Sequence, residues 1–229
     1  MDVRLELITG TPIIFNKVKV YQPKLSQILG IGEKQYEKHL LPFVVDKEDL
    51  DLPKEFDGLT VFDIFTLDIN LVFFLEAIRF FCMMDEMKYN QELKRLYIGE
   101  GYIDNSNFYE FSELILELSA KKKEKKENFT PQSEKQKEIW EKLQNGRKRQ
   151  AEKKGIKLFD IINLCQFGGE YYIPIKDILD WTPWQLNNCY RTIISKSCYK
   201  DNFSVFLETG KQELVKEHWS DKIKIPCKI

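Results

Sequence analysis

Short apolar runs separated by turn-forming residues open the chain. They lie at residues 5–8, 13–15 and 18–21, and Thr9-Gly10-Thr11-Pro12 follows the first of them. Runs of this length, broken by glycine and proline, are typical of short strands joined by tight turns. We therefore expect a small N-terminal β-hairpin, with residues 5–8 forming a strand.

Helical spacing replaces this pattern after Pro23. Apolar residues recur every three or four positions as far as Pro42, with an interruption at Gly30 and Gly32. This spacing predicts two short helices separated by a glycine-containing break. The acidic stretch at residues 46–58 then predicts a loop.

The most apolar part of the chain is residues 59–81, which is rich in phenylalanine. Its second half, residues 71–81, is hydrophobic almost all round, as in a helix at the centre of a module. Residues 87–103 predict short strands around a turn. A helix over residues 108–118 closes this N-terminal module.

A charged segment follows at residues 120–132, with five lysines within six residues and a proline at Pro131. It has no apolar periodicity, which is typical of a linker. We therefore divide the chain into an N-terminal module at residues 1–119, a basic linker at residues 120–132 and a C-terminal module at residues 133–229. A polar helix is expected to open the third part.

Helical patterns dominate the C-terminal module. Short helices are expected over residues 158–164 and 175–179. Thr182-Pro183 marks the start of a longer helix running toward Gly210, because threonine caps helices and proline suits the first helical position. We expect Leu186 on this helix to pack against residues 158–164. The predicted fold class is mainly α with small β-hairpins, an α+β N-terminal module and an all-α C-terminal module.

Charge is unevenly distributed, although the net charge of the 229 residues is −1. Residues 121–157 contain fourteen Lys or Arg and six Glu, a surplus of +8, so the remainder carries −9. A basic arm can bind nucleic acid, but basic solvated helices are common, and we favour the second interpretation. The candidate basic segment consists of Lys121, Lys122, Lys123, Lys125, Lys126, Arg147, Lys148 and Arg149.

Catalytic and metal-binding patterns are missing from the sequence. His39 and His218 are isolated, and the five cysteines include no C-x-x-C pair. We expect free, mostly buried thiols, no metal and no cofactor. Clustered acids in residues 46–68 leave an enzyme as a third hypothesis, but acidic loops are usually solvated surface.

Targeting patterns are also missing. No apolar run approaches the roughly eighteen residues of a membrane span, and the first residues do not resemble a secretory signal. The sequence therefore predicts a cytoplasmic protein that does not enter a membrane.

All four tryptophans lie in the C-terminal half of the chain. Tryptophan and arginine are enriched at the centres of protein interfaces, although tryptophan also fills cores. The candidate partner-binding residues are Trp140, Trp181, Trp184, Tyr190, Arg191 and Trp219.

Both ends of the chain resemble one family. The N-terminal match is Val20-Tyr21-Gln22-Pro23-Lys24-Leu25-Ser26-Gln27-Ile28 followed by Ile31-Gly32-Glu33-Lys34-Gln35-Tyr36. The C-terminal match covers residues 140–157, then Trp184-Gln185-Leu186 through Tyr190-Arg191, and finally His218-Trp219-Ser220. These short phrases are similar to the tail assembly chaperones of long-tailed phages and prophages of Gram-positive bacteria. The dense lysine run at residues 121–126 departs from the family pattern.

The resemblance implies a non-enzymatic protein in the bacterial host cytoplasm that coats the phage tape measure protein while the tail tube polymerises around it. The resemblance also allows contact with tail tube subunits and self-association. The alternative is a phage protein that binds nucleic acid through residues 121–157. The acidic charge of the rest of the chain argues against this alternative.

Overall fold

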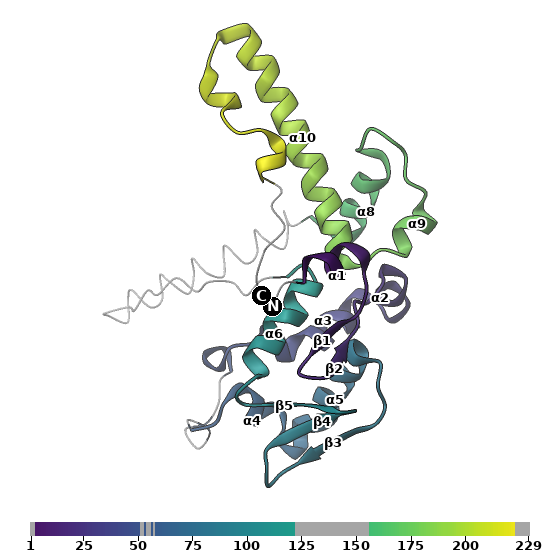
Figure 1. Cartoon of the computed structure of the whole chain (residues 1–229), viewed down its shortest axis with the longest axis vertical. Coiled ribbons are helices and arrows are strands. Elements are labelled where there is room, and N and C mark those ends of the chain that lie inside the picture. The colour runs from purple at the N-terminus through teal and green to yellow at the C-terminus, as the bar shows by residue number, and fades with distance from the viewer. Residues whose placement is uncertain (1–2, 51–52, 54–55, 57, 122–155, 223–229) are drawn as a thin grey trace, which may run out of the picture.

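The computed structural model describes residues 3–50, 53, 56, 58–121 and 156–222. The fold is mainly helical with two small antiparallel sheets, as the sequence predicted. An α+β body contains both sheets, and one long helix projects from it (Figure 1).

The chain begins with a helix where the sequence predicted a strand. α1 spans Arg4–Thr9 and ends at Gly10 with a φ of 70°. Val3 and Leu7, one helical turn apart, are buried, whereas Leu5 is exposed. A strand would place Leu5 and Leu7 on one face, so the expected strand at residues 5–8 is wrong.

The predicted hairpin is confirmed immediately afterwards. β1 (Ile13–Phe15) pairs with β2 (Val18–Val20) in an antiparallel register that places Ile13 opposite Val20. The outer residues of each strand are buried and the central residue is exposed. One face of the hairpin therefore belongs to the core.

The two helices expected after Pro23 are also confirmed. They are α2 (Leu25–Ile31) and α3 (Glu33–Val44), with Pro42 inside the last turn of α3. Gly32 separates them with a φ of 85°, a conformation that residues with a side chain rarely adopt. A short 3₁₀ helix, η1 (Lys47–Asp49), lies in the predicted loop.

The phenylalanine-rich region forms α4 (Val61–Phe65) and α5 (Asp68–Cys82). α5 buries Phe74, Ala77, Ile78, Phe81 and Cys82, which places one face of this helix in the core. Ile69 and Val72 in its first turns are exposed, so the start of α5 lies at the surface.

A three-stranded sheet and a helix follow. The strands β3 (Met87–Asn90), β4 (Arg95–Ile98) and β5 (Gly101–Asp104) pair in sequence order. The helix is α6 (Phe108–Leu118). At Gly101 a side chain would collide with the Asn16 carbonyl and with Val18. This glycine therefore allows the sheet to approach the N-terminal hairpin.

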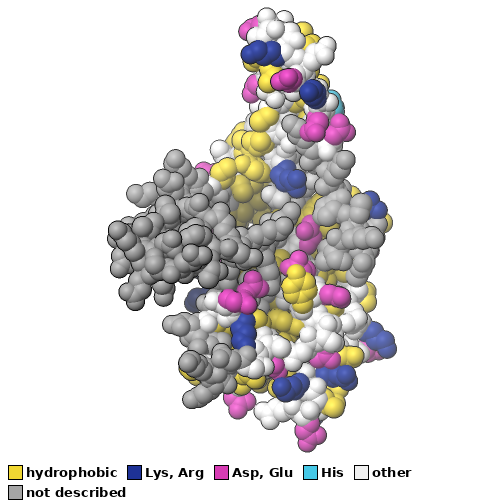
Figure 2. Space-filling model, turned by 90° about the vertical axis from the view of Figure 1, so that its left-hand side faces the viewer, with side chains coloured by type: hydrophobic (Ala, Val, Ile, Leu, Met, Phe, Trp, Pro, Cys, Tyr) yellow, Lys and Arg dark blue, Asp and Glu magenta, His cyan; other side chains and the backbone are white. Residues whose placement is uncertain are grey.

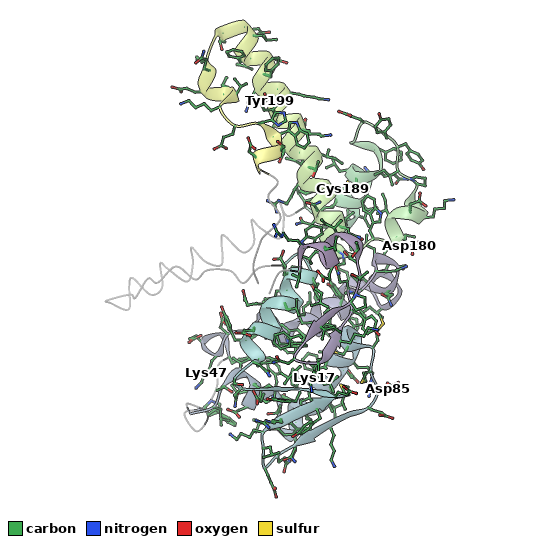
Figure 3. All side chains as sticks on the ribbon, viewed as in Figure 1. Lys17, Lys47, Asp85, Asp180, Cys189 and Tyr199 are labelled. Carbon is green, nitrogen blue, oxygen red and sulfur yellow. The ribbon has the colours of Figure 1, made fainter. Side chains whose placement is uncertain are left out.

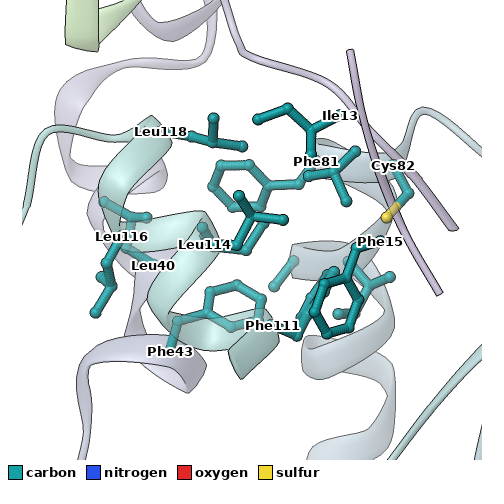
Figure 4. Packing of buried hydrophobic residues seen from close by; sticks show 14 of the residues in the cluster. Ile13, Phe15, Leu40, Phe43, Phe81, Cys82, Phe111, Leu114, Leu116 and Leu118 are labelled. Carbon is teal, nitrogen blue, oxygen red and sulfur yellow. The ribbon is translucent and has the colours of Figure 1, made fainter. Parts of the chain in front are cut away.

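Aromatic rings from three helices meet in the core (Figure 4). Phe43 of α3 packs edge-on against Phe81 of α5, with ring centroids 5.8 Å apart, and against Phe111 of α6 at 5.9 Å. Perpendicular aromatic pairs of this kind are favourable beyond their burial alone.

The C-terminal helices are α8 (Leu158–Phe167), α9 (Ile175–Leu179) and α10 (Pro183–Thr209), followed by the 3₁₀ helices η3 (Gln212–Val215) and η4 (Trp219–Lys222). All three α-helices were expected from the sequence.

The buried core continues from the body into these helices. Ile162, Ile178, Trp184 and Leu186 belong to the same cluster as the body's phenylalanines. The division at residues 120–132 stays a prediction, since all but the first two of those residues, and the polar helix predicted after them, lie outside the described chain. In the described part, no helix is both long and apolar enough to cross a membrane.

Candidate partner-binding surface

The long helix α10 begins at a well-formed N-terminal cap. Thr182 Oγ1 accepts a hydrogen bond from the Gln185 N–H at 3.2 Å, and Gln185 Oε1 accepts one from the Thr182 N–H at 2.8 Å. Pro183 occupies the first helical position, where no N–H is needed. The Thr-Pro signal in the sequence therefore placed this helix start correctly.

The first turn of α10 and the residue before its N-cap, Trp181, are attached to the body at three points. The Gln185 side-chain amide donates to the carbonyl of Ile8 in α1 at 2.7 Å. Trp184 Nε1 donates to Glu117 Oε1 in α6 at 3.2 Å. The Trp181 carbonyl accepts from the Leu25 N–H of α2 at 2.8 Å. These bonds fix the direction in which the helix leaves the body.

Beyond Leu186, α10 has no fully buried side chain, and its last side chains packed against the core are Cys189, Tyr190 and Ile193. We call residues 187–222, which comprise the rest of α10 with η3 and η4, the arm. The buried residues of α10 are Pro183, Trp184 and Leu186, and none of the described side chains of the arm is fully buried. A helix of this length spans about 40 Å, so most of it extends past the body (Figure 1).

Exposed hydrophobic side chains occur along the arm. They are Ile194, Phe203, Val205 and Leu207, and Leu207 is 69% exposed. On the face shown in Figure 2, hydrophobic side chains gather over the lower half of the projection, and its tip is mostly polar and charged. Contiguous apolar surface on a small protein commonly marks an interaction site.

Aromatic contacts hold the end of the arm against the middle of α10. Trp219 of η4 lies under the ammonium of Lys196, whose Nζ is 4.7 Å from the ring centroid. His218 packs edge-on against Tyr199, with centroids 5.0 Å apart. Such contacts, a cation–π pair among them, hold η4 against α10.

A second exposed aromatic group lies in the turn after α8. Phe167, Tyr171 and Tyr172 are all more than half exposed, and the rings of Phe167 and Tyr172 are 5.6 Å apart. Ile175, the first residue of α9, is exposed nearby in sequence. Rigid aromatic side chains with one exposed face are common contact residues in interfaces.

The structure places the partner-binding residues predicted from the sequence in different environments, from buried to exposed. Trp184 is only 7% exposed and packs in the core. Trp181, Tyr190 and Trp219 are half-buried, and Arg191 is exposed. Trp140 lies outside the described residues. Tyr190, Arg191 and Trp219 therefore lie on the arm. Trp184 is buried and attaches the helix to the body.

Of the predicted basic segment, the structure describes only Lys121, which is exposed. Lys122, Lys123, Lys125, Lys126, Arg147, Lys148 and Arg149 lie outside the described residues. Over residues 187–222 the arm has six basic and five acidic residues. A net charge of +1 gives the arm little attraction for a phosphate backbone.

The exposure of apolar residues near the end of α10 has a signal in the sequence that the sequence analysis did not use. The end of α10 carries three apolar residues in a row. Val205, Phe206 and Leu207 are consecutive, and consecutive residues point about 100° apart on a helix. They cannot share one buried stripe, and two of these three are exposed.

A cavity of about 210 Å³ lies where α10 meets the body. Its lining includes Tyr36 and Ser119, whose buried hydroxyls make no well-formed hydrogen bond among the described residues. Burial raises the pKa of Tyr36 to about 12, and the nearby Ser119 hydroxyl partly offsets this. A partner group reaching this cavity would meet an apolar wall with two available hydroxyls.

Within the described residues, no three His, Cys, Asp or Glu side chains are grouped so that they could hold a metal ion. Comparisons with protein-family models, curated proteins and solved structures gave no match to this chain. The arm and its attachment are therefore interpreted from their own geometry.

Proposed function

We propose that this protein is a non-enzymatic tail assembly chaperone of a long-tailed phage or prophage, and that its arm binds the tape measure protein. The observation that carries the proposal is the long helix α10, whose second half extends past the body (Figure 1) with Phe203, Val205 and Leu207 exposed. Helices in proteins gain most of their stability from packing, so a projecting helix with exposed apolar residues is suited to packing against a partner.

The arrangement of elements at the N-terminus agrees with the family resemblance. The hairpin of β1 and β2 is followed by Pro23, the short helix α2, the Gly32-Glu33 step and the helix α3 that contains Tyr36. This is the order that the resemblance implies. It supports the proposal without identifying the partner.

A tape measure protein is a long helical chain whose apolar stripes need protection from aggregation. Helices can lay apolar faces against one another in the way amphipathic peptides bind grooves. Phe203 and Leu207 are one helical turn apart on the arm and are both exposed, so they can contact one partner helix together. A modest affinity for each bound copy of the chaperone would let tail tube subunits displace the chaperones from the tape measure protein.

The test is co-expression with a tape measure fragment from the same phage genome that is insoluble alone. The wild-type protein should keep the fragment in solution. The double variant Phe203→Ser/Leu207→Ser should lose this effect. Ile69→Ser is the matched control, because Ile69 is 88% exposed on α5 in the body. If the fragment stays insoluble with wild-type protein, or if both variants behave alike, the proposal is wrong.

A further inference from the structure

Two cysteines share a cavity at the base of the arm. The cavity measures about 350 Å³ and lies between α8, the turn after it and α10. Cys165 of α8 and Cys189 of α10 both line it, together with Glu170, Lys196 and Lys200. Figure 3 shows Cys189 on the lower part of α10, where α8 lies beside it. A small polar molecule in this space can therefore reach the partly exposed Cys189, whereas Cys165 is buried.

The two thiols line this cavity from neighbouring, packed helices. Cys165 is fully buried, and Cys189 is partly exposed on the facing helix. Interaction with the Cys165 thiol lowers the pKa of Cys189, against the opposing effect of burial. The same interaction, together with burial, raises the pKa of Cys165. Cys189 is therefore the more acidic thiol of the pair.

Charged side chains also line the cavity. Lys196 and Lys200 are one helical turn apart on α10. Lys200 Nζ lies 3.4 Å from Glu170 Oε1, and Lys196 lies over the Trp219 ring. The space is therefore polar enough to admit a small polar oxidant.

The other described cysteines have different surroundings. Cys82 is buried in the body core, and burial raises the pKa of its thiol to about 12. Cys198 is exposed on the arm. These two residues supply controls within the same chain, one buried and one accessible.

We propose that Cys165 and Cys189 form an oxidisable thiol pair, with Cys189 as the residue that reacts with a hydroperoxide entering the cavity. The Cys189 thiolate attacks one peroxide oxygen, the O–O bond breaks, and Cys189 becomes a sulfenic acid while alkoxide or hydroxide leaves. The Cys165 sulfur then attacks the Cys189 sulfur. The S–O bond breaks, a disulfide forms, and the hydroxyl group leaves with the Cys165 proton as water.

The consequence is a covalent link between α8 and α10. These helices already pack together through the core, and the Cys165 thiol also lies 3.7 Å from the Leu186 carbonyl. The disulfide would fix the base of the arm against its neighbour. This inference rests on the cavity and the thiol pair, and it is independent of what the arm binds.

The experiment uses the full-length, reduced protein treated with one equivalent of hydrogen peroxide, followed by non-reducing peptide mapping. The expected main product is a Cys165–Cys189 disulfide, seen as the loss of two hydrogens from the linked peptides. Cys82→Ser and Cys198→Ser should leave its yield unchanged. In Cys165→Ala, Cys189 should accumulate as a sulfenic acid that dimedone traps.

The wild-type map alone decides the question even where a variant folds poorly. Oxidation found first at Cys198, with Cys165 and Cys189 still reduced, would overturn the proposal. So would an equal yield of the disulfide in urea-unfolded protein, because the folded cavity would then contribute nothing.

Discussion

The indole N–H of Trp184 donates a hydrogen bond to Glu117 Oε1 at 3.2 Å, and this bond joins the first turn of α10 to the last turn of α6. The two residues are 67 positions apart in the sequence. Trp184 is buried and Glu117 is half-buried, so the bond is partly shielded from water. It holds the long helix to the body.

Removing this donor should weaken the attachment. Trp184→Phe keeps an aromatic ring but loses the hydrogen bond to a charged acceptor, and it should lower the free energy of unfolding by about 1–2 kcal/mol. Glu117→Gln retains an acceptor oxygen and should cost under about 1 kcal/mol. Urea denaturation measures both values. Equal stability of Trp184→Phe and wild type would show that the bond contributes nothing.

Leu186 and Leu207 lie on the same helix in opposite environments. Leu186 is 2% exposed and belongs to the core, as the sequence predicted, whereas Leu207 is largely exposed. Leu186→Ala should lower the free energy of unfolding by about 2–5 kcal/mol. Leu207→Ala should change it by no more than about 0.5 kcal/mol. A loss at Leu186 under half a kcal/mol would contradict the described packing.

Asp63 gives the body a specific dependence on acid. Burial alone would raise its pKa, but hydrogen bonds from the Thr60 backbone, Asn105, the Thr60 hydroxyl and Lys94 lower it to about 2. The ionised form is therefore favoured in the folded state. Its contribution, about 2 kcal/mol from the size of the pKa shift, is present above the ordinary pKa of 3.8 and is lost as the pH falls toward 2.

The substitution Asp63→Asn tests this dependence. At pH 7 the variant should be less stable than wild type, and the difference should shrink as the pH falls from about 4 to 2. Thermal unfolding measured across this range gives the comparison. A stability gap that stays constant with pH would mean that ionisation of Asp63 is not involved.

Limited trypsin digestion tests the division of the chain. The lysine run at residues 121–126 offers the densest set of trypsin sites, so the first cut is expected there. The two pieces should still elute together in gel filtration, because Ile162 and Leu186 pack in the same core as the body. Early cleavage within residues 59–84 would contradict the predicted division, and separation of the pieces would contradict the shared core.

Local patterns were enough to predict most elements of this fold. The Thr182-Pro183 start of α10 and its end at Gly210 follow from capping preferences that involve only neighbouring residues. The glycine break between α2 and α3 also follows from the backbone conformation that Gly32 adopts. Signals of this type do not depend on tertiary contacts.

Tertiary packing decides the features that local patterns did not reveal. The segment at residues 5–8 contains alternating apolar residues, but only the partners of Val3 and Leu7 in the core select the helix. The burial of Trp184 depends on Glu117 and α6, which are distant in sequence. The pairing of Cys165 with Cys189 likewise depends on how α8 crosses α10, which their spacing does not reveal.

The most direct test of the proposed function is a binding isotherm between the purified protein and a soluble helical fragment of its phage tape measure protein. We expect modest affinity for wild type, and Phe203→Ser/Leu207→Ser should weaken binding at least tenfold, about 1.4 kcal/mol. Ile69→Ser should bind as tightly as wild type. Absence of binding by the wild-type protein, or unchanged affinity in the double variant, would contradict the assignment of the arm as the binding surface.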